Sequence, residues 1–394
     1  MDLKKDELIM RRNLFAARLD TDFPEWDSCI IITKINQYYF TGTMQDGFIL
    51  MKRDGTFSYF VRQSYQRAVS ESPLDEIYPI KSYRDAAAKD GDFLGNALFE
   101  TGNVPYAVIE RLHGYFNINK IFSAEKIISR IRSVKSEYEL YWMKKSGEMH
   151  DKLLTEQVPS MLREGMSEAQ LYGNLLGKMT ELGYHGISRF EKFQTEIQLG
   201  QIGFGSNSLV PTSFDGPGGS RGNSPAVPLG GDPDRLLKKG DLVFVDLGFG
   251  IKGYHSDKTQ VYSFGTDPSE EALSAHAFCL RIQEKLARSI RPGAVPSEIY
   301  SDIMSSLTEE ENKNFMGFQS HKVKFLGHGV GLAIDESPVI AAGFNDPIEK
   351  NMVFACEPKK GVENQGMTGV EDTFAVTDTG CECITGSSRQ IIKV

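Results

Sequence analysis

The sequence predicts two domains that both combine helices with strands: a smaller α/β domain at 1–130 and a larger α+β domain at 131–394. The 394 residues exceed what one ordinary hydrophobic core holds. A hydrophobic fraction of 40% with 25% charged residues is typical of a globular protein rather than a disordered one. Helix and strand patterns alternate in the first third, and the pattern changes around Val134-Lys135-Ser136, where we place the junction.

The elements of the first domain follow from local patterns. We expect, in chain order, a helix at 2–18, a strand at 29–35, strands at 48–52 and 57–61, a strand at 106–109 and a helix at 124–132. Arg53-Asp54-Gly55 separates the second and third strands, and an Asp-Gly pair between apolar runs is typical of a hairpin.

The second domain begins with helices and continues with strands. We expect helices at 137–158, 167–182, 269–290 and after Val295, with strands at 242–247, 257–264, 353–357 and 369–377. Ser167 and Gln170 form a capping-box pattern at the start of the second helix.

A passage rich in glycine and proline, at 200–231, interrupts these elements. It cannot form a regular helix or strand, and a long irregular loop in a compact domain is usually functional or disordered. It lacks the G-x-x-x-x-G-K-[ST] pattern of a phosphate-binding loop. We therefore expect its segment 214–231 to fold over an active site, with Arg221 as a candidate anion contact.

Two aspartates next to apolar strands are the first candidate site residues. Asp246 ends the run Val243-Phe-Val, and Asp257 enters a second apolar strand eleven residues later. Either one alone is explained as a turn cap. Two such carboxylates at facing ends of a hairpin repel each other unless a cation lies between them.

The second half of the domain adds three residues of matching type. His328 stands between glycines, and Glu357 and Glu371 each adjoin an apolar strand. A single histidine is more often structural than metal-bound, but four acids with one imidazole form an oxygen-rich set that suits Mn, Fe, Co or Zn. The sequence therefore predicts a metal site with the ligands Asp246, Asp257, His328, Glu357 and Glu371.

These residues, in the contexts DLG, SDKT, GHGVG, CEP and GVEDT, resemble the creatinase/prolidase/methionine aminopeptidase superfamily of M24 metallopeptidases. Residues 130–139 resemble its domain junction and Tyr38-Tyr-Phe-Thr-Gly42 its N-terminal domain, so the likeness covers essentially the whole chain. It implies a "pita-bread" catalytic domain, a curved antiparallel sheet covered by helices, after a creatinase-like N-terminal domain.

The resemblance also implies roles for the site residues. Two divalent ions (Mn, Co, Zn or Fe) would be bound, with Asp246 as a bidentate ligand, Asp257 and Glu371 as bridges, and His328 and Glu357 as terminal ligands. Glu357 would act as general base toward the bridging water. A homodimer is implied as well.

The chain departs from the prolidase pattern around this site. Three histidines that prolidases use to bind substrate and transfer protons are replaced by Leu229, Lys324 and Asp335. We expect these three to line the pocket, with Lys324 neutralising an oxyanion or a substrate carboxylate and Asp335 relaying a proton. An arginine of the family pattern is Gln260, and the glycine after its Glu-Pro motif is Lys359.

Other residues with possible site chemistry are more simply explained as structural. His185 and His255 are imidazole candidates near the metal motifs, and we expect satisfied or solvated side chains at both. Cys381 and Cys383 form a C-x-C without a second pair to complete a zinc site, so we expect ordinary strand residues.

Composition and local sequence patterns indicate which binding partners and which cellular compartment to expect. A net charge of −9 argues against nucleic acid or an anionic membrane, and no apolar run approaches the ~20 residues of a membrane span. The first thirty residues lack a signal-peptide core, and five scattered cysteines do not form a secreted disulfide framework. These observations indicate the cytoplasm.

Three functions follow from these observations. The first is metal-dependent hydrolysis of a C–N bond in a small peptide of Xaa-Pro type. The second is other chemistry on a small metabolite, such as hydrolysis of a cyclic amidine or a lyase reaction. The third is a non-catalytic binding module, which the retention of all five ligands disfavours.

Overall fold

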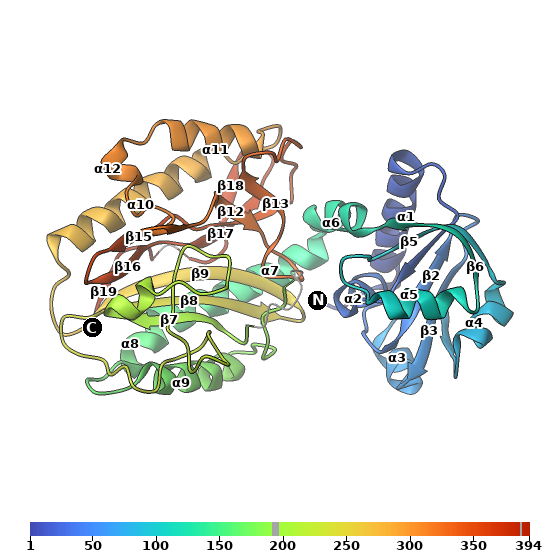
Figure 1. The fold of residues 1–394 in the computed structure, drawn as a ribbon, viewed down its shortest axis with the longest axis horizontal. Coiled ribbons are helices and arrows are strands. Elements are labelled where there is room, and N and C mark those ends of the chain that lie inside the picture. The colour runs from blue at the N-terminus through green and yellow to red at the C-terminus, as the bar shows by residue number, and fades with distance from the viewer. Residues whose placement is uncertain (191–196, 387) are drawn as a thin grey trace. The chain divides into compact units, whose positions relative to one another are not determined.

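The computed structural model describes residues 1–190, 197–386 and 388–394. The chain divides into two compact units, Met1–Arg132 and Ser133–Val394, each with its own sheets and helices (Figure 1). The division falls two residues after the boundary that we placed at 130/131.

The first unit is built on one mixed sheet of six strands in the order β4-β3-β2-β1-β5-β6. The strands are β1 (Ser28–Ile31), β2 (Asp46–Lys52), β3 (Phe57–Gln63), β4 (Ile77–Pro79), β5 (Phe93–Phe99) and β6 (Asn117–Ser123). The helices are α1 (Lys5–Asp22), α2 (Lys34–Thr41), α3 (Tyr65–Glu71), α4 (Tyr83–Asp90), α5 (Tyr106–His113) and α6 (Glu125–Ser133). This is the α/β arrangement that the alternating pattern predicts.

The predicted hairpin at Arg53-Asp54-Gly55 is confirmed, since β2 and β3 pair antiparallel on either side of it. The strand predicted at 106–109 is wrong, because these residues begin helix α5. Val108 and Ile109 favour strands by local propensity, but Ile109 and Leu112 are buried three residues apart on one helical face.

The second unit contains two main sheets. The strands are β7 (Gly200–Phe204), β8 (Leu242–Ile251), β9 (Tyr254–Ser263), β10 (Gly317–Phe318), β11 (His321–Lys322), β12 (Phe325–Gly329), β13 (Glu336–Ala341), β14 (Val353–Cys356), β15 (Lys359–Val362), β16 (Gly366–Gly369), β17 (Asp372–Val376), β18 (Cys381–Cys383) and β19 (Ile392–Lys393). One sheet has the order β19-β9-β8-β7 and the other β13-β12-β14-β17-β18, while β15 and β16 form a separate pair. An isolated bridge between Thr259 and Glu371 links the two main sheets.

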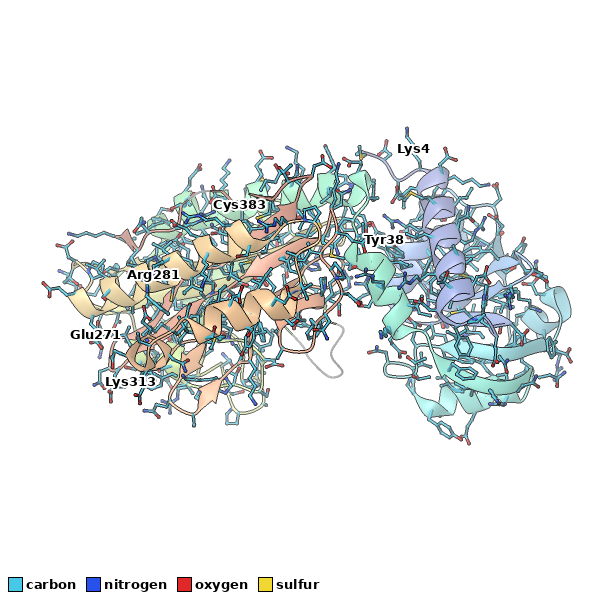
Figure 2. All side chains as sticks on the ribbon, turned by 90° about the horizontal axis from the view of Figure 1, so that it is seen from above. Lys4, Tyr38, Glu271, Arg281, Lys313 and Cys383 are labelled. Atoms are coloured by element: carbon cyan, nitrogen blue, oxygen red, sulfur yellow. The ribbon has the colours of Figure 1, made fainter. Side chains whose placement is uncertain are left out.

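Helices cover these sheets. They are α7 (Glu137–Lys152), a π-helical turn at Leu153–Gln157, α8 (Val158–Met161), α9 (Glu168–Glu181), α10 (Glu270–Ser289), α11 (Pro296–Ser305) and α12 (Glu309–Asn312). In Figure 1, α10 and α11 lie above the sheets and α8 and α9 below them. Exposed Glu271 and Arg281 mark the outer face of α10 (Figure 2). The second unit thus has the layered architecture that the sequence and the resemblance predict.

Local signals explain where these helices begin. Ser167 accepts a hydrogen bond from the Gln170 amide and completes the predicted capping box of α9. Ser269 caps α10 in the same way, and Glu270 and Glu271 in its first turn complement the helix dipole. Within the described residues, none of the helices has the length and apolar character that a bilayer crossing requires.

Candidate metal centre

The hairpin of β8 and β9 positions the two predicted aspartate ligands. Both strands run on past these residues, so the aspartates lie within the strands and not at the hairpin ends as we expected. In the register Gly248 faces Asp257, and Asp246 lies two residues before Gly248. Alternate residues of a strand share a face, so Asp246 and Asp257 project diagonally toward the same side of the sheet.

His328 lies on β12, and the glycines around it make room for neighbouring strands. A Cβ atom on Gly327 would lie 2.3 Å from the carbonyl oxygen of Ala355, and one on Gly329 would lie 2.4 Å from that of Ser337. The glycines thus permit close strand packing. The Nδ1 atom of His328 lies 3.1 Å from the Gly329 carbonyl oxygen, which can only accept. This contact places a proton on Nδ1 and leaves Nε2 facing the carboxylates.

The two glutamates complete the set from the second sheet. Glu357 directly follows β14, and Glu371 lies between β16 and β17, where its carbonyl accepts from the Thr259 amide of β9. Thr259 also donates its hydroxyl to Glu371 Oε2 at 2.9 Å. The bridge that joins the two sheets therefore also fixes the Glu371 carboxylate.

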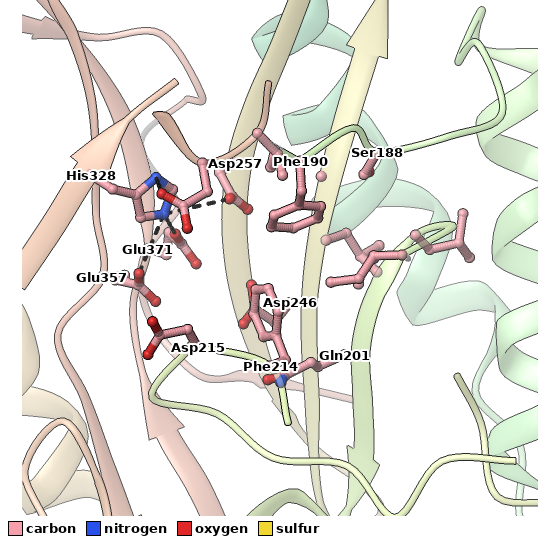
Figure 3. A pocket seen from close by; sticks show the side chains of 17 residues that line it. Ser188, Phe190, Gln201, Phe214, Asp215, Asp246, Asp257, His328, Glu357 and Glu371 are labelled. Carbon is pink, nitrogen blue, oxygen red and sulfur yellow. Dashed lines mark ion pairs between the residues drawn. The ribbon is translucent and has the colours of Figure 1, made fainter. Parts of the chain in front are cut away.

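All five predicted ligands lie at one pocket (Figure 3). His328 Nε2 is 3.4 Å from Glu357 Oε1, 3.9 Å from Asp257 Oδ2 and 3.9 Å from Glu371 Oε1. One ligand atom each from Asp257, His328 and Glu371 fall within 4.8 Å of one another, and all three residues are buried. We call these three residues the histidine side of the cluster.

A lysine occupies the other side of the cluster. Lys359 opens β15, two residues after Glu357, and its side chain is fully buried. Its Nζ lies 2.8 Å from each of three carboxylate oxygens, on Asp246, Glu357 and Glu371. We call Lys359 with Asp246 and Glu357 the lysine side; Glu371 contacts both sides.

Burial and neighbouring charges shift the pKa values of the cluster residues. Burial raises the pKa of Asp257 and Glu371 well above the usual carboxyl range, and neighbouring carboxylates add to this. Burial acts in the same direction on Glu357, but Lys359 and His328 outweigh it and lower its pKa. Burial disfavours the charged forms of His328 and Lys359, yet the surrounding carboxylates raise both pKa values well above normal.

The donor set fits one divalent ion but not two. The histidine side offers two carboxylates and one imidazole in a small buried space, which is the chemistry of a catalytic metal site. A second ion would need Asp246 and the free oxygens of Glu357 and Glu371. Those oxygens already accept hydrogen bonds from the ammonium of Lys359.

The remaining pocket wall comes from three other segments. Phe190 and Phe214 pack edge to face with ring centroids 5.4 Å apart, and Asp215 adjoins Phe214 in the glycine-rich passage (Figure 3). Asp335 also lines the pocket, with an oxygen 3.8 Å from His328 Nδ1. Gln201 is 1% exposed, and neither polar atom of its side chain has a hydrogen-bond partner among the described residues.

Two of the residues predicted for this wall lie elsewhere. Lys324 is exposed, and neither it nor Leu229 is among the described residues that line the pocket. A β-bulge between Phe325 and His328 interrupts the side-chain alternation that would direct Lys324 and His328 to the same side. Arg221 is exposed as well and reaches Asp232 at 4.0 Å, so it is not a pocket residue either.

The other candidates have structural environments. His185 and His255 contact each other through their Nε2 atoms at 3.3 Å, and burial lowers their pKa values to about 3 and about 4. Both are therefore neutral near pH 7 and lie outside the residues that line the pocket. Cys381 and Cys383 are strand residues of β18, as expected, and all five cysteines are free.

The sequence signalled the position of Lys359 without our assigning it a role. Residues i and i+2 of an extended segment share a face, so a lysine two residues after Glu357 is directed to the same side as that ligand. Asp215 and Gln201 carried no comparable signal. The prediction that 200–231 contains no regular strand is wrong at its start, where Gly200–Phe204 form β7. Gln201 enters the pocket because β7 pairs with β8 in a register that sets it opposite Asp246.

Comparisons with known proteins find matches over both units of the chain. Residues 141–378 match the profile of metallopeptidase family M24, and residues 22–134 match that of the creatinase/prolidase N-terminal domain. A curated relative, the Xaa-Pro dipeptidase of Pyrococcus furiosus, is 26% identical over 376 residues, covering 93% of this chain and 95% of the relative.

Solved structures show the same fold. The prolidase from Pyrococcus horikoshii OT3 superposes with a TM-score of 0.79 at 24% identity, covering 97% of this chain and all of that one. The X-Pro aminopeptidase from Thermotoga maritima MSB8 gives a TM-score of 0.76 at 22% identity, covering 96% of this chain and 99% of the other.

Proposed function

The chain belongs to metallopeptidase family M24, a family of metallohydrolases, and we propose that it hydrolyses a C–N bond in a small peptide of the Xaa-Pro type. The observation that carries the proposal is the buried group of Asp257, His328 and Glu371 at the pocket. The name of the Pyrococcus furiosus relative supplies the substrate class.

Different residues at the pocket would have different roles in such a reaction. Asp257, His328 and Glu371 would hold a divalent ion, which supplies an activated water and polarises a carbonyl group. The Gly329 carbonyl orients His328 by accepting from Nδ1, the contact that usually fixes the tautomer of a ligating histidine. The Phe190–Phe214 pair forms an apolar wall that excludes water from one side of the pocket.

We propose Glu357 and Asp335 as the groups that move protons. Glu357 Oε1 faces His328, and Asp335 lines the pocket on the opposite side of that imidazole. A general acid or base must lie within hydrogen-bond reach of the proton it transfers, which these positions permit for a bound peptide. Among the described residues, no contact at the pocket supports the same role for Lys324.

Gln201 is the proposed substrate contact. A buried amide without partners costs about 1–3 kcal/mol, and a substrate group that accepts from it and donates to it would remove that cost. The backbone of a short peptide offers both a carbonyl and an amide group.

Kinetics on a panel of Xaa-Pro dipeptides, with Mn, Co, Zn and Fe added in turn, test this proposal. We expect metal-dependent but slow turnover, because positions 229, 324 and 335 lack the histidines of prolidases and each positioned acid–base group contributes about 10²–10⁴-fold. A kcat/KM within the ordinary range of about 10⁴–10⁸ M⁻¹s⁻¹ would show that those histidines are dispensable here. No turnover of any peptide would contradict the proposal.

The same three positions favour a second candidate, a non-peptidase reaction on a small metabolite. Cyclic amides, cyclic amidines and sulfonium compounds belong in the same screen, and metal-dependent turnover of one of them with inert peptides would establish it. A binding module would show metal uptake without turnover of either group.

Three further properties rest on resemblance and composition. We propose a homodimer, a cytoplasmic location and the absence of nucleic acid and membrane partners. The family pattern implies two metal ions. Lys359 already binds three of the five predicted ligands, which argues against the second ion in this chain.

A further inference from the structure

Lys359 uses every donor of its ammonium group inside the cluster. A lysine ammonium carries three N–H bonds, and here three carboxylate oxygens lie at 2.8 Å from Nζ. These short distances are typical of charge-assisted hydrogen bonds. No donor is left for a substrate, so Lys359 acts on the cluster and not on a bound molecule.

The acceptors of Lys359 are ligands that the family pattern assigns to metal. Asp246 is the expected bidentate ligand of one ion, and Glu371 is an expected bridge. A compact ammonium in contact with both occupies the place of a cation on the lysine side. Its Nζ also lies 5.8 Å from the centroid of the Phe244 ring, and both residues are fully buried, so the charge is held inside the packed interior.

The charge of one ammonium does not balance the cluster. Four buried or nearly buried carboxylates meet there, and the histidine side retains Asp257 and Glu371 within 4.8 Å of the His328 ligand atom. Buried carboxylates in such proximity require a further cation or protons.

We propose that Lys359 permanently replaces one of the two metal ions, so that the site binds a single divalent ion, held by Asp257, His328 and Glu371. The inference rests on the metal dependence in the proposed function but not on its peptide substrate. The second positive charge of the centre is then part of the fold and cannot be removed by a chelator.

Metal stoichiometry tests this directly. Purified protein would be stripped with a chelator, dialysed against excess Mn²⁺ and assayed for Mn per chain, with electron paramagnetic resonance as a second readout. We expect one ion per chain and the spectrum of an isolated Mn²⁺ in the wild type. The Lys359→Gly variant restores the family glycine and should bind two ions with a spin-coupled spectrum.

Lys360→Gly is the matched control. It makes the same change at the next residue of β15, but Lys360 contacts backbone carbonyls of Glu310, Glu311 and Lys313 outside the cluster. Any general effect of a glycine in this strand is therefore common to both variants. The Lys360→Gly variant should still bind one ion per chain.

Two ions, or none, in the wild type would overturn the proposal, as would a single ion in a folded Lys359→Gly variant. If that variant does not fold, anomalous diffraction from Mn-soaked wild-type crystals decides, with one peak expected at the histidine side and two peaks contradicting it. These measurements use no substrate, so an inactive protein that binds one ion would refute the proposed function and leave this inference intact.

Discussion

Two buried charge clusters of the second unit are formed by residues that are neighbours in the chain. One cluster lies at the pocket and the other lies away from it. Asp257 and Glu371 face the pocket, whereas their neighbours Lys258 and Asp372 form a second buried cluster away from it. In that second cluster Lys258 Nζ lies 2.6 Å from Asp372 Oδ1, and Arg389 Nε lies 2.9 Å from Asp372 Oδ2. Strand alternation therefore separates the two groups even though they are one residue apart in the chain.

The two clusters differ in charge balance. Asp372 has two cationic partners and a hydrogen bond from the Thr385 hydroxyl, so its charge is fully compensated inside the protein. The pocket cluster has four carboxylates for one ammonium and one imidazole. A buried cluster whose charges compensate one another stabilises the fold. A cluster with excess negative charge beside a pocket is instead a site that binds a cation from solution. The predictions below test that distinction.

The largest effect is expected at the balanced cluster. Lys258→Met removes a fully buried cation and leaves Asp372 short of a partner, a change that typically costs about 3–5 kcal/mol of stability. Urea denaturation with and without Mn²⁺ measures it, and the loss should be the same in both. Recovery on addition of metal would show that this cluster also binds a cation.

Metal-linked stability is the next largest effect. A ligand at 100 times its Kd stabilises the folded state by about 2.7 kcal/mol, so excess Mn²⁺ should raise the unfolding free energy of the wild type by that order. His328→Ala should abolish the increase. His276→Ala is the control, since His276 is buried against Thr368 and the Arg389 carbonyl, away from the pocket. An undiminished Mn²⁺ effect in His328→Ala would exclude His328 as a ligand.

The ligand-type residues could be predicted from sequence because each interrupts an apolar run where a carboxylate or imidazole is otherwise unfavourable. What could not be predicted is contact between distant segments. Lys359 reaches Asp246, which is 113 residues away, and that contact depends on how the β15–β16 pair packs against β8. Its departure from the family glycine was visible in the sequence, but its three acceptors were not.

Local propensity failed where tertiary packing decided the outcome. Tyr106, Val108 and Ile109 have strand-forming side chains, yet the chain there forms α5 because Ile109 and Leu112 bury one helical face. Likewise, the prediction that Lys324 lines the pocket rested on the family resemblance, and the bulge in β12 changes the side-chain directions between this residue and His328. The domain pattern and the hairpin at Gly55 were predictable because their signals are local.

A third type of buried carboxylate allows a pH test. Glu168 is fully buried and accepts from the Phe204 and Asp232 amides and from Asn207, without a cation in those contacts. Burial raises its pKa to about 7, only partly offset by these hydrogen bonds.

A raised pKa means that the folded state binds this proton more tightly than the unfolded state. The associated stability is therefore present below pH 4.5 and is lost as the pH rises through about 7. We expect roughly 2 kcal/mol of such loss between pH 5 and pH 8 in the wild type, and its absence in Glu168→Gln. Equal pH slopes for the two proteins, from urea denaturation at each pH, would refute the assignment.

The smallest effect, about 1 kcal/mol, is expected at Gln201, and its sign is informative. Replacing a buried amide that has no partners by an apolar group of similar size removes a desolvation cost, so Gln201→Leu should stabilise the protein while lowering kcat/KM for the best substrate of the panel. Gln37→Leu is the matched control: the Gln37 amide is equally buried but donates to the Ile32 and Gly47 carbonyls, so the same change should destabilise. Thermal denaturation and steady-state kinetics of the two variants provide the comparison. A Gln201→Leu variant that loses stability and keeps full kcat/KM would mean that this amide serves the fold and not the substrate.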